Sequence, residues 1–156
     1  MAIDIKKSND AELIARLNYT VQELHHKQYP KYFKPYDYEA VGRIFKENLA
    51  KDNWYAYVAY DDVLPIGYII FYIRDYEENP FRLSYKGIHI DQLCVVENYH
   101  KRGIGSRLME KAEEIGKNVK ATQLELTFWE KNCDAKEFYI KKGFEEGMHF
   151  VLKKIE

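Results

Sequence analysis

The first apolar pattern along the chain has the spacing of a helix. In residues 9–24, "NDAELIARLNYTVQEL", apolar side chains recur every three or four positions and fall on one helical face: Leu13, Ile14, Leu17, Val21 and Leu24. Asn9 and Glu12 have the spacing of a capping box, which predicts the start of this helix. Pro30 and Pro35 then break the pattern. A second helix is predicted next, with inward positions Val41, Ile44, Phe45 and Leu49.

The middle of the chain changes to the two-residue period of strands. Residues 54–60, "WYAYVAY", alternate and are rich in aromatic side chains. "DDVLPIG" turns the chain and "YIIFYIRDY", residues 68–76, returns it, so this region predicts a β-hairpin. Residues 87–96, "GIHIDQLCVV", are apolar on both faces, which is typical of a central strand in a covered sheet.

Helices and strands alternate in the last third of the chain. A helix is predicted for residues 104–119, with Leu108, Met109, Ala112 and Ile115 inward. "TQLELTF" predicts a strand, "DAKEFYIKK" a short helix, and "HFVLKKI", residues 149–155, a final strand. This order of elements predicts an α/β fold with a mixed sheet. No repeat or linker interrupts it, so residues 1–156 are expected to form a single domain.

Composition and charge narrow the class of protein. Charged residues make up 31% and hydrophobic ones 46% of the chain, which indicates a folded protein. A net charge of -1 argues against general binding of nucleic acids. The first residues, "MAIDIKKSND", carry no apolar signal region, and no run is long enough to span a bilayer, so we expect a cytoplasmic location. The five histidines show no zinc-ligand spacing, and no metal is expected.

Residues 100–109, "HKRGIGSRLM", combine two glycines with cationic side chains just before the predicted helix. A helix start offers unpaired N–H groups and the positive end of the helix dipole. Gly103 and Gly105 have no Cβ, so a ligand can approach their backbone closely. Lys101 and Arg102 add charge, and Ser106 adds a hydroxyl, so the stretch is consistent with a phosphate-binding loop. An ordinary tight turn is the alternative. The spacing fits neither a P-loop nor a dinucleotide-binding loop.

Two separated motifs resemble the GNAT superfamily of N-acetyltransferases. The first is "LCVVENYHKRGIG" and the second is "NCDAKEFYIKKGFEE", and together they cover roughly residues 88–145. His100 departs from the arginine or glutamine that is usual in the family. The resemblance implies the GNAT fold, a mixed central β-sheet flanked by helices on both faces. It also implies acetyl-CoA as co-substrate, so that the anion at the glycine loop would be its pyrophosphate.

The resemblance also assigns residues to the cofactor. Leu93, Cys94 and Val95 would run along the pantetheine arm and acetyl group, and Asn132 would contact pantetheine. A helix cap is the structural alternative for Asn132. The full set of expected cofactor-binding residues is Leu93, Cys94, Val95, His100, Lys101, Arg102, Gly103, Ile104, Gly105, Ser106, Asn132 and Tyr139.

Amine acetylation needs a base. An alkyl ammonium has a pKa near 10.4, so presenting it as a free amine at pH 7 costs roughly 4–5 kcal/mol. Simple alternation places His89, Asp91, Leu93 and Val95 on one face of their strand. Asp91 is the first candidate for the base and His89 the second, with Glu130 weaker. A purely structural pairing is the alternative for Asp91.

The resemblance places Tyr139 at the departing sulfur of CoA. A phenol is a weaker acid than a thiol, so Tyr139 would act mainly as a hydrogen-bond donor to the developing charge. A core tyrosine is the alternative. Cys94 and Cys133, expected as free thiols, lack the adjacent base that nucleophilic catalysis needs. Direct attack of the amine in a ternary complex is therefore preferred.

The acceptor stays open between several classes. A small primary amine is favoured, because Asp61, Asp62, Asp75, Glu77 and Glu78 are expected to surround the entrance and attract a cation. A protein lysine or N-terminus is the first alternative, and a non-catalytic acyl-CoA-binding module is the second. The expected entrance is lined by His25, His26, Phe33, Tyr36 and Trp129. No nucleic acid or membrane partner is expected, and a homodimer stays open.

Overall fold

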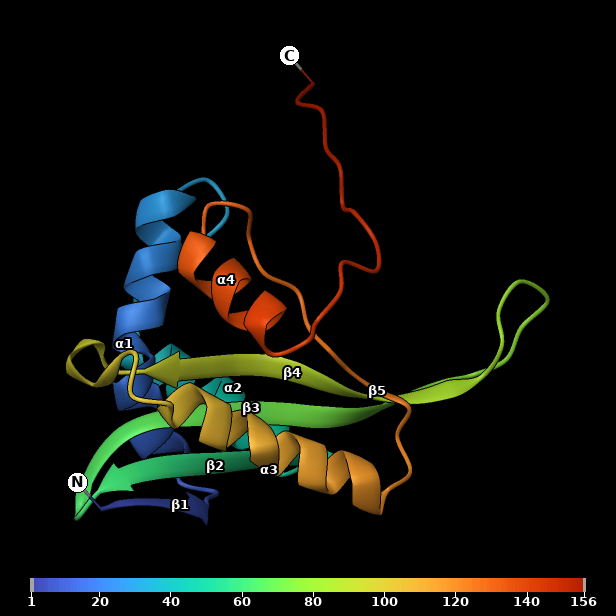
Figure 1. The fold of residues 1–156 in the computed structure, drawn as a ribbon. Helices are drawn as coiled ribbons and strands as arrows, with labels where there is room; N and C mark the ends of the chain where they lie inside the picture. Colours follow the sequence, from blue (N-terminus) through green and yellow to red (C-terminus); the bar gives the residue numbers. More distant parts are fainter. Residues whose placement is uncertain (1, 156) are drawn as a thin grey trace. The chain divides into compact units, whose positions relative to one another are not determined.

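The computed structural model describes residues 2–155. Its elements are β1 (Ile3–Lys7), α1 (Ala11–Gln28), α2 (Tyr38–Leu49), β2 (Trp54–Asp61), β3 (Leu64–Tyr76), β4 (Tyr85–Val95), the 3-10 turn η1 (Glu97–Tyr99), α3 (Ile104–Asn118), β5 (Gln123–Glu125) and α4 (Cys133–Lys141) (Figure 1). They form two compact units, residues 1–126 and 127–156. The first unit holds the whole sheet with α1, α2 and α3, and the second holds α4.

The five strands lie in the order β1-β2-β3-β4-β5. The first four are antiparallel to their neighbours, and β5 is parallel to β4, which confirms the mixed sheet. Helices α1 and α2 cover one face of this sheet and α3 covers the other (Figure 1). Alternation in β2 separates the two faces, because Ala56 and Val58 point into the α1/α2 core while Tyr57 lies beside Lys111 of α3.

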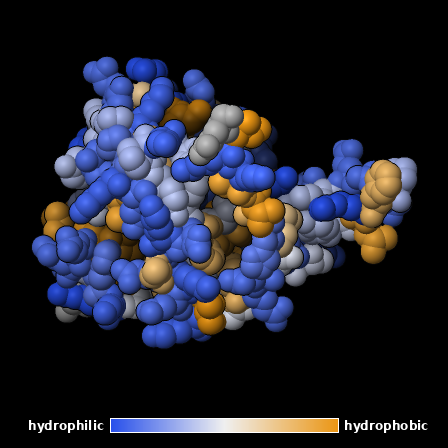
Figure 2. Space-filling model, turned by 90° about the horizontal axis from the view of Figure 1, so that it is seen from above, coloured by the Kyte–Doolittle hydropathy of each residue, from blue (hydrophilic) through white to orange (hydrophobic). Residues whose placement is uncertain are grey.

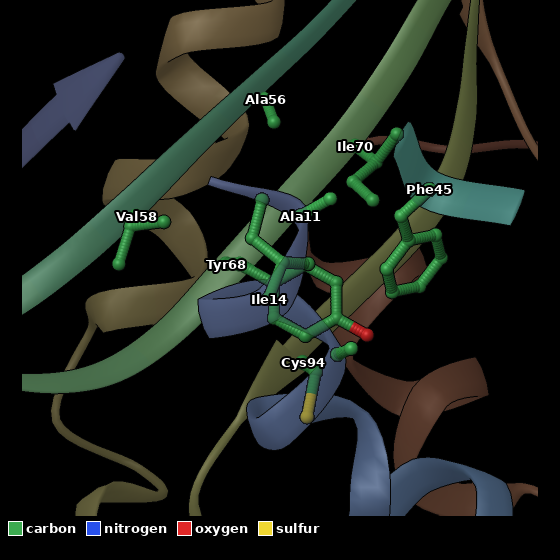
Figure 3. Close-up of a cluster of buried hydrophobic side chains, with 9 residues drawn as sticks. Ala11, Ile14, Phe45, Ala56, Val58, Tyr68, Ile70 and Cys94 are labelled. Carbon is green, nitrogen blue, oxygen red and sulfur yellow. The ribbon is translucent and has the colours of Figure 1, made fainter. Parts of the chain in front are cut away.

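One buried cluster joins α1 and α2 to the sheet. Figure 3 shows its side chains, which come from both helices and from β2, β3 and β4: Ala11, Ile14, Phe45, Ala56, Val58, Tyr68, Ile70 and Cys94. The phenol of Tyr68 is held within this layer, because Asn18 donates to its oxygen over 2.9 Å and the phenol donates to Gln92 over 3.0 Å. Asn18 also donates to Gln92 over 3.0 Å. These three bonds fix α1, β3 and β4 together.

Strand β4 contains an extra residue at Asp91. Ile70 of β3 pairs with Gln92 and Phe71 pairs with Ile90, so Asp91 has no opposite residue and forms a β-bulge. The bulge reverses the alternation of β4. Before it, His89 pairs with Tyr72 on the α1/α2 face; after it, Leu93 and Val95 point to the α3 face. The prediction that His89, Asp91, Leu93 and Val95 share one face is therefore wrong.

Strands β3 and β4 continue past the rest of the sheet as a hairpin arm, green in Figure 1. The connecting loop carries Phe81 and Leu83, which are 94% and 79% exposed. Figure 2 shows apolar surface at the tip of this arm. No helix within residues 2–155 is long and apolar enough to cross a membrane.

Several predicted helix details differ from the structure. Helix α1 is capped by Asp10, whose carboxylate accepts from the Leu13 N–H over 3.0 Å, so the capping box from Asn9 is wrong. Asp10 is correctly placed to reach an N–H in the first turn, and Asn9 is one residue too early. In α2, Phe45 is buried but Ile44 is exposed, because the core takes a narrower stripe of this helix than the sequence pattern suggested.

The strands at the two ends of the sheet also differ. Residues 3–7 form an edge strand that the sequence did not predict, because charged residues mask its short apolar pattern. Strand β5 is limited to Gln123–Glu125. The strand predicted for residues 149–155 is absent, since no described strand pairs with that segment, and its apolar side chains are exposed: Phe150, Val151, Leu152 and Ile155.

Candidate active site

The edge of β4 that faces β5 is open over its second half. Strand β5 pairs with β4 only at Gly87, Ile88 and His89. Of residues 2–155, none forms a strand ladder with this edge from Ile90 to Val95. An open strand edge offers N–H and C=O groups to an extended ligand, which can pair with it as an added strand. This edge contains Leu93–Val95, the segment that the family resemblance assigned to the pantetheine arm.

The glycine loop follows directly after the open edge. Lys101 and Gly103 both have left-handed backbone conformations, with φ of 60° and 78°. Gly103 is the N-cap of α3 and has no side chain with which to bond the first helical turn. The N–H groups at the start of this 15-residue helix are therefore available to a ligand. Together with the helix dipole, this geometry favours an anion, as the sequence predicted.

The loop is tied to the sheet by its own side chains. His100 places Nε2 2.6 Å from the Val95 carbonyl oxygen, so the N–H at this position donates to the end of β4. Tyr99 donates to Asp61 over 2.7 Å, and the Arg102 guanidinium lies 5.0 Å from the Tyr99 ring centroid. His100 thus has a structural role in shaping the loop.

Cys94 points to the α1/α2 face of β4. It is buried in the α1/α2 core, and its Sγ lies 3.5 Å from the Leu17 carbonyl oxygen. Burial raises the pKa of the Cys94 thiol to about 12. Such a thiol is a poor nucleophile. A cofactor along this edge would therefore contact Cys94 only through its backbone. The side chains of Leu93 and Val95 point to the α3 face.

The two main candidates for the base, His89 and Asp91, have different places in β4. His89 belongs to the regular ladder, and Asp91 is the bulge residue. Burial lowers the pKa of His89, while the nearby carboxylate of Glu125 acts in the opposite direction. Partial burial raises the pKa of Asp91, although its side chain is exposed at the bulge, and His89 opposes this shift. The raised pKa of Asp91 moves toward a value that suits proton transfer near neutral pH, whereas the lowered pKa of His89 moves away from neutrality and leaves its imidazole uncharged there.

Glu125 and Tyr76 lie near His89, although neither residue was singled out in the sequence. Glu125 pairs with His89 across the parallel β4–β5 ladder. Tyr76 donates to Glu125 Oε2 over 2.7 Å. No local motif marks either residue, because 49 positions separate them in sequence. Their meeting depends on the register of three strands.

The second unit carries the remaining predicted site residues. Asn132 caps α4, and its Oδ1 accepts from the Ala135 N–H over 3.3 Å. The structural alternative for Asn132 is thus correct, and its amide nitrogen is not used in this cap. Tyr139 packs between the rings of Phe128, Phe138 and Phe144. Burial raises the pKa of Tyr139 to about 12, which weakens it as an acid and leaves its O–H as a hydrogen-bond donor.

The acidic residues expected around one entrance do not form one group. Asp61 and Asp62 lie at the turn between β2 and β3, beside the glycine loop. Asp75 lies near the other end of β3, roughly 35 Å away for an extended strand. Glu77 and Glu78 lie beyond that end. The expectation of one negative field from all five is therefore wrong, because a long strand separates the two sets.

The residues expected to line the entrance are used to order the loop between α1 and α2. The rings of His25 and Phe33 are 4.7 Å apart, and His26 Nδ1 lies 2.8 Å from the Phe33 carbonyl oxygen. Tyr36 donates to the Ala15 carbonyl oxygen.

A hollow elsewhere in the first unit, between the last turn of α3 and β5, is lined by Gly116, Lys117 and Leu124 among others. It lies at the end of α3 that is remote from the glycine loop.

These features agree with a comparison of the chain against known families. The profile of the acetyltransferase (GNAT) family matches residues 18–144. The chain belongs to the GNAT acetyltransferase family. The matched range includes the open edge of β4, the glycine loop and Tyr139, so the candidate site lies within the region that carries the family match.

Relatives and solved structures agree with this assignment. A probable N-acetyltransferase of Mycobacterium tuberculosis is 30% identical over 112 residues, which are 70% of this chain and 58% of that protein. The matches to curated relatives span between 33% and 58% of those relatives' lengths.

Among solved structures, a mutant of a Bacillus halodurans protein superposes with a TM-score of 0.90 at 23% identity, over 100% of both chains. An aminoglycoside N-acetyltransferase solved in complex with CoA gives a TM-score of 0.72 at 18% identity, over 99% and 95% of the two chains. These likenesses confirm the GNAT fold.

Proposed function

We propose that this protein transfers the acetyl group of acetyl-CoA to the primary amine of a small cationic molecule. The observation that carries the proposal is the continuity of two features in one short segment. The open edge of β4 ends at Val95, and the uncapped start of α3 follows at Ile104. An extended arm paired with the edge would place its pyrophosphate at the helix N-terminus.

In this proposal Lys101–Ser106 bind pyrophosphate through backbone N–H groups, and Leu93–Val95 bind the arm. Lys101 and Arg102 add positive charge. Asn132 contributes its amide nitrogen to the cofactor. The amine attacks the thioester carbonyl directly, the C–S bond breaks and CoA leaves as a thiol. The substrate nitrogen loses two protons in all, one to the base before attack and one that ends on sulfur.

Asp91 is the proposed base. A carboxyl group with a raised pKa holds a transferred proton more readily than an ordinary aspartate. Its bulge position carries it out of the strand ladder, next to the segment proposed for the acetyl group. Tyr139 is proposed to donate a hydrogen bond to the developing thiolate. Its raised pKa favours donation over complete proton transfer.

The acceptor class rests on charge and on a neighbour of known type. Asp75 lies in the last residues of β3, Glu77 and Glu78 follow it, and the three carboxylates would attract a cation. The N-acetyltransferase of similar fold acts, by its name, on aminoglycosides. A protein lysine or N-terminus is the competing acceptor, and a panel of both kinds separates them.

Calorimetry with CoA tests the site. Gly105→Glu puts a carboxylate at the helix start, where it repels pyrophosphate, so we expect CoA binding to be lost while the fold is kept. Glu113→Gln, on the exposed side of the same helix, is the matched control and should bind CoA normally. Unchanged CoA affinity in a folded Gly105→Glu protein would refute the site. Release of CoA with small amines and with lysine peptides then identifies the acceptor class.

A further inference from the structure

A cluster of polar and aromatic side chains lies on the α1/α2 face of the sheet, at the end of β3 that leads into the hairpin arm. We define the Glu125 cluster as Tyr76, Gly87, His89 and Glu125. Three strands supply it, since Tyr76 belongs to β3, Gly87 and His89 to β4, and Glu125 to β5. Glu125 stands opposite His89 in the ladder, and Tyr76 donates to its Oε2 over 2.7 Å.

The cluster contains two buried polar atoms that lack partners. Glu125 Oε1 and His89 Nδ1 are shielded from solvent and have no hydrogen-bond partner among the described residues. Burying such an atom unpaired is costly, and folded proteins usually avoid it. Two orphan atoms on residues that face each other in one ladder therefore point to a ligand that supplies hydrogen bonds there.

Glycine at position 87 makes room for the carboxylate. A Cβ built on Gly87 would overlap Glu125 Oε1. The carboxylate thus lies directly against bare backbone, where any other residue would displace it. Tyr76 holds the second oxygen, so Glu125 is fixed from two sides. A carboxylate held in one orientation with one oxygen unused is suited to accept from a ligand cation.

The surroundings favour a cation on an apolar stem. Trp54 and Tyr72 stack with their centroids 4.5 Å apart, and Tyr72 lies 5.1 Å from the ring of His89. Aromatic faces attract ammonium groups and pack against methylenes. Apart from Glu125, the charged groups that act on the pKa of His89 are Arg74, whose guanidinium lies 4.4 Å from the Tyr76 ring, and Asp91. Among the described residues no ion pair neutralises Glu125.

We propose that Glu125, held by Tyr76 over Gly87, binds a second, non-reacting ammonium group of the acceptor. This inference rests on the proposed acetyl transfer and specifies its substrate class as a linear diamine or longer polyamine. His89 pairs with Tyr72 and Leu93 with Ile69, so three ladder steps, roughly 10 Å, separate His89 from Leu93 along the sheet. The reacting amine lies at the Leu93 end and the second ammonium at the Glu125 end, joined by an apolar chain that passes the Tyr72 ring beside His89.

Acetylation of linear α,ω-diamines of increasing length tests the proposal, with n-alkylamines of equal length as matched monoamines. Glu125→Gln keeps the shape and the hydrogen bond from Tyr76 but removes the charge. We expect it to lower kcat/KM for the preferred diamine about 10- to 100-fold, chiefly through KM, because a charged hydrogen bond is lost. The monoamine of equal length should change less than about twofold. Glu114→Gln on α3 removes an exposed carboxylate and should leave both substrates unaffected.

Gly87→Ala provides a second variant, since its Cβ displaces the carboxylate without changing any charge. It should reduce selectivity for diamines in the same direction. Equal losses on mono- and diamines, or no loss on either, would overturn the subsite while leaving acetyl transfer intact. If no amine is acetylated, the proposed function fails. Calorimetry of the diamine with wild-type protein and Glu125→Gln then still decides whether Glu125 binds ammonium.

Discussion

At the scale of single residues, the roles of Asp91 and His89 are separated by the bulge between them. His89 faces the α1/α2 layer and lies against Tyr72, whereas Asp91 stands outside the strand ladder. The two side chains are neighbours in sequence but belong to different surroundings. The same distinction gives the first prediction, because their ionisation shifts in opposite directions.

Asp91→Asn should lower kcat about 100-fold and remove the acidic limb of the pH profile of kcat/KM. The pKa of Asp91 is raised from 3.8, so its carboxylate accepts protons at neutral pH and loses this ability as the pH falls through the raised value. Stopped assays of CoA release across this pH range measure the limb. His89→Gln is the control and should retain the limb. If His89→Gln removes it instead, His89 is the base.

At the scale of elements, the start of α1 offers a matched pair of substitutions. Asp10→Ala removes the side chain that accepts from the Leu13 N–H, and should lower the free energy of unfolding by about 1 kcal/mol. Asn9→Ala changes the neighbouring position, which does not cap, and should alter stability by less than about 0.5 kcal/mol. Urea unfolding followed by circular dichroism gives both values. A larger effect at Asn9 would contradict the observed cap.

Elements with strong local signals were predicted well, and those that depend on partners were not. The starts of α3 at Ile104 and of α4 at Cys133 fall within a residue of the prediction, because glycine, asparagine and apolar spacing act locally. The bulge at Asp91 cannot be read from β4 alone, since it is a mismatch with β3. Glu125 was missed for a similar reason, as its importance comes from Tyr76 and His89 on other strands.

At the scale of the whole molecule, three polar side chains join the layers of the first unit. Tyr68 is fully buried and bonds both Asn18 of α1 and Gln92 of β4. Gln92 directly follows the bulge. The same network that holds α1 on the sheet therefore also fixes the strand beside the proposed base.

Tyr68→Phe should lower the free energy of unfolding by about 1–3 kcal/mol, because it leaves Asn18 and Gln92 with a buried hydrogen bond unmade. Tyr19→Phe removes a hydroxyl from an exposed tyrosine and should change stability by less than about 0.5 kcal/mol. Chemical denaturation of the two variants side by side provides the comparison. Equal stabilities would show that the Tyr68 hydroxyl contributes nothing net to the fold.

The single extra residue in β4 has a consequence for how its variants are interpreted. Up to Ile90, even-numbered positions belong to the α3 side; from Gln92 onward, even-numbered positions belong to the α1/α2 side. A substitution series along the strand should thus show two-residue periodicity with its phase inverted at Asp91. Deleting Asp91 would join Ile90 directly to Gln92 and restore simple alternation, so both halves should keep their faces while the local bend of the bulge is lost.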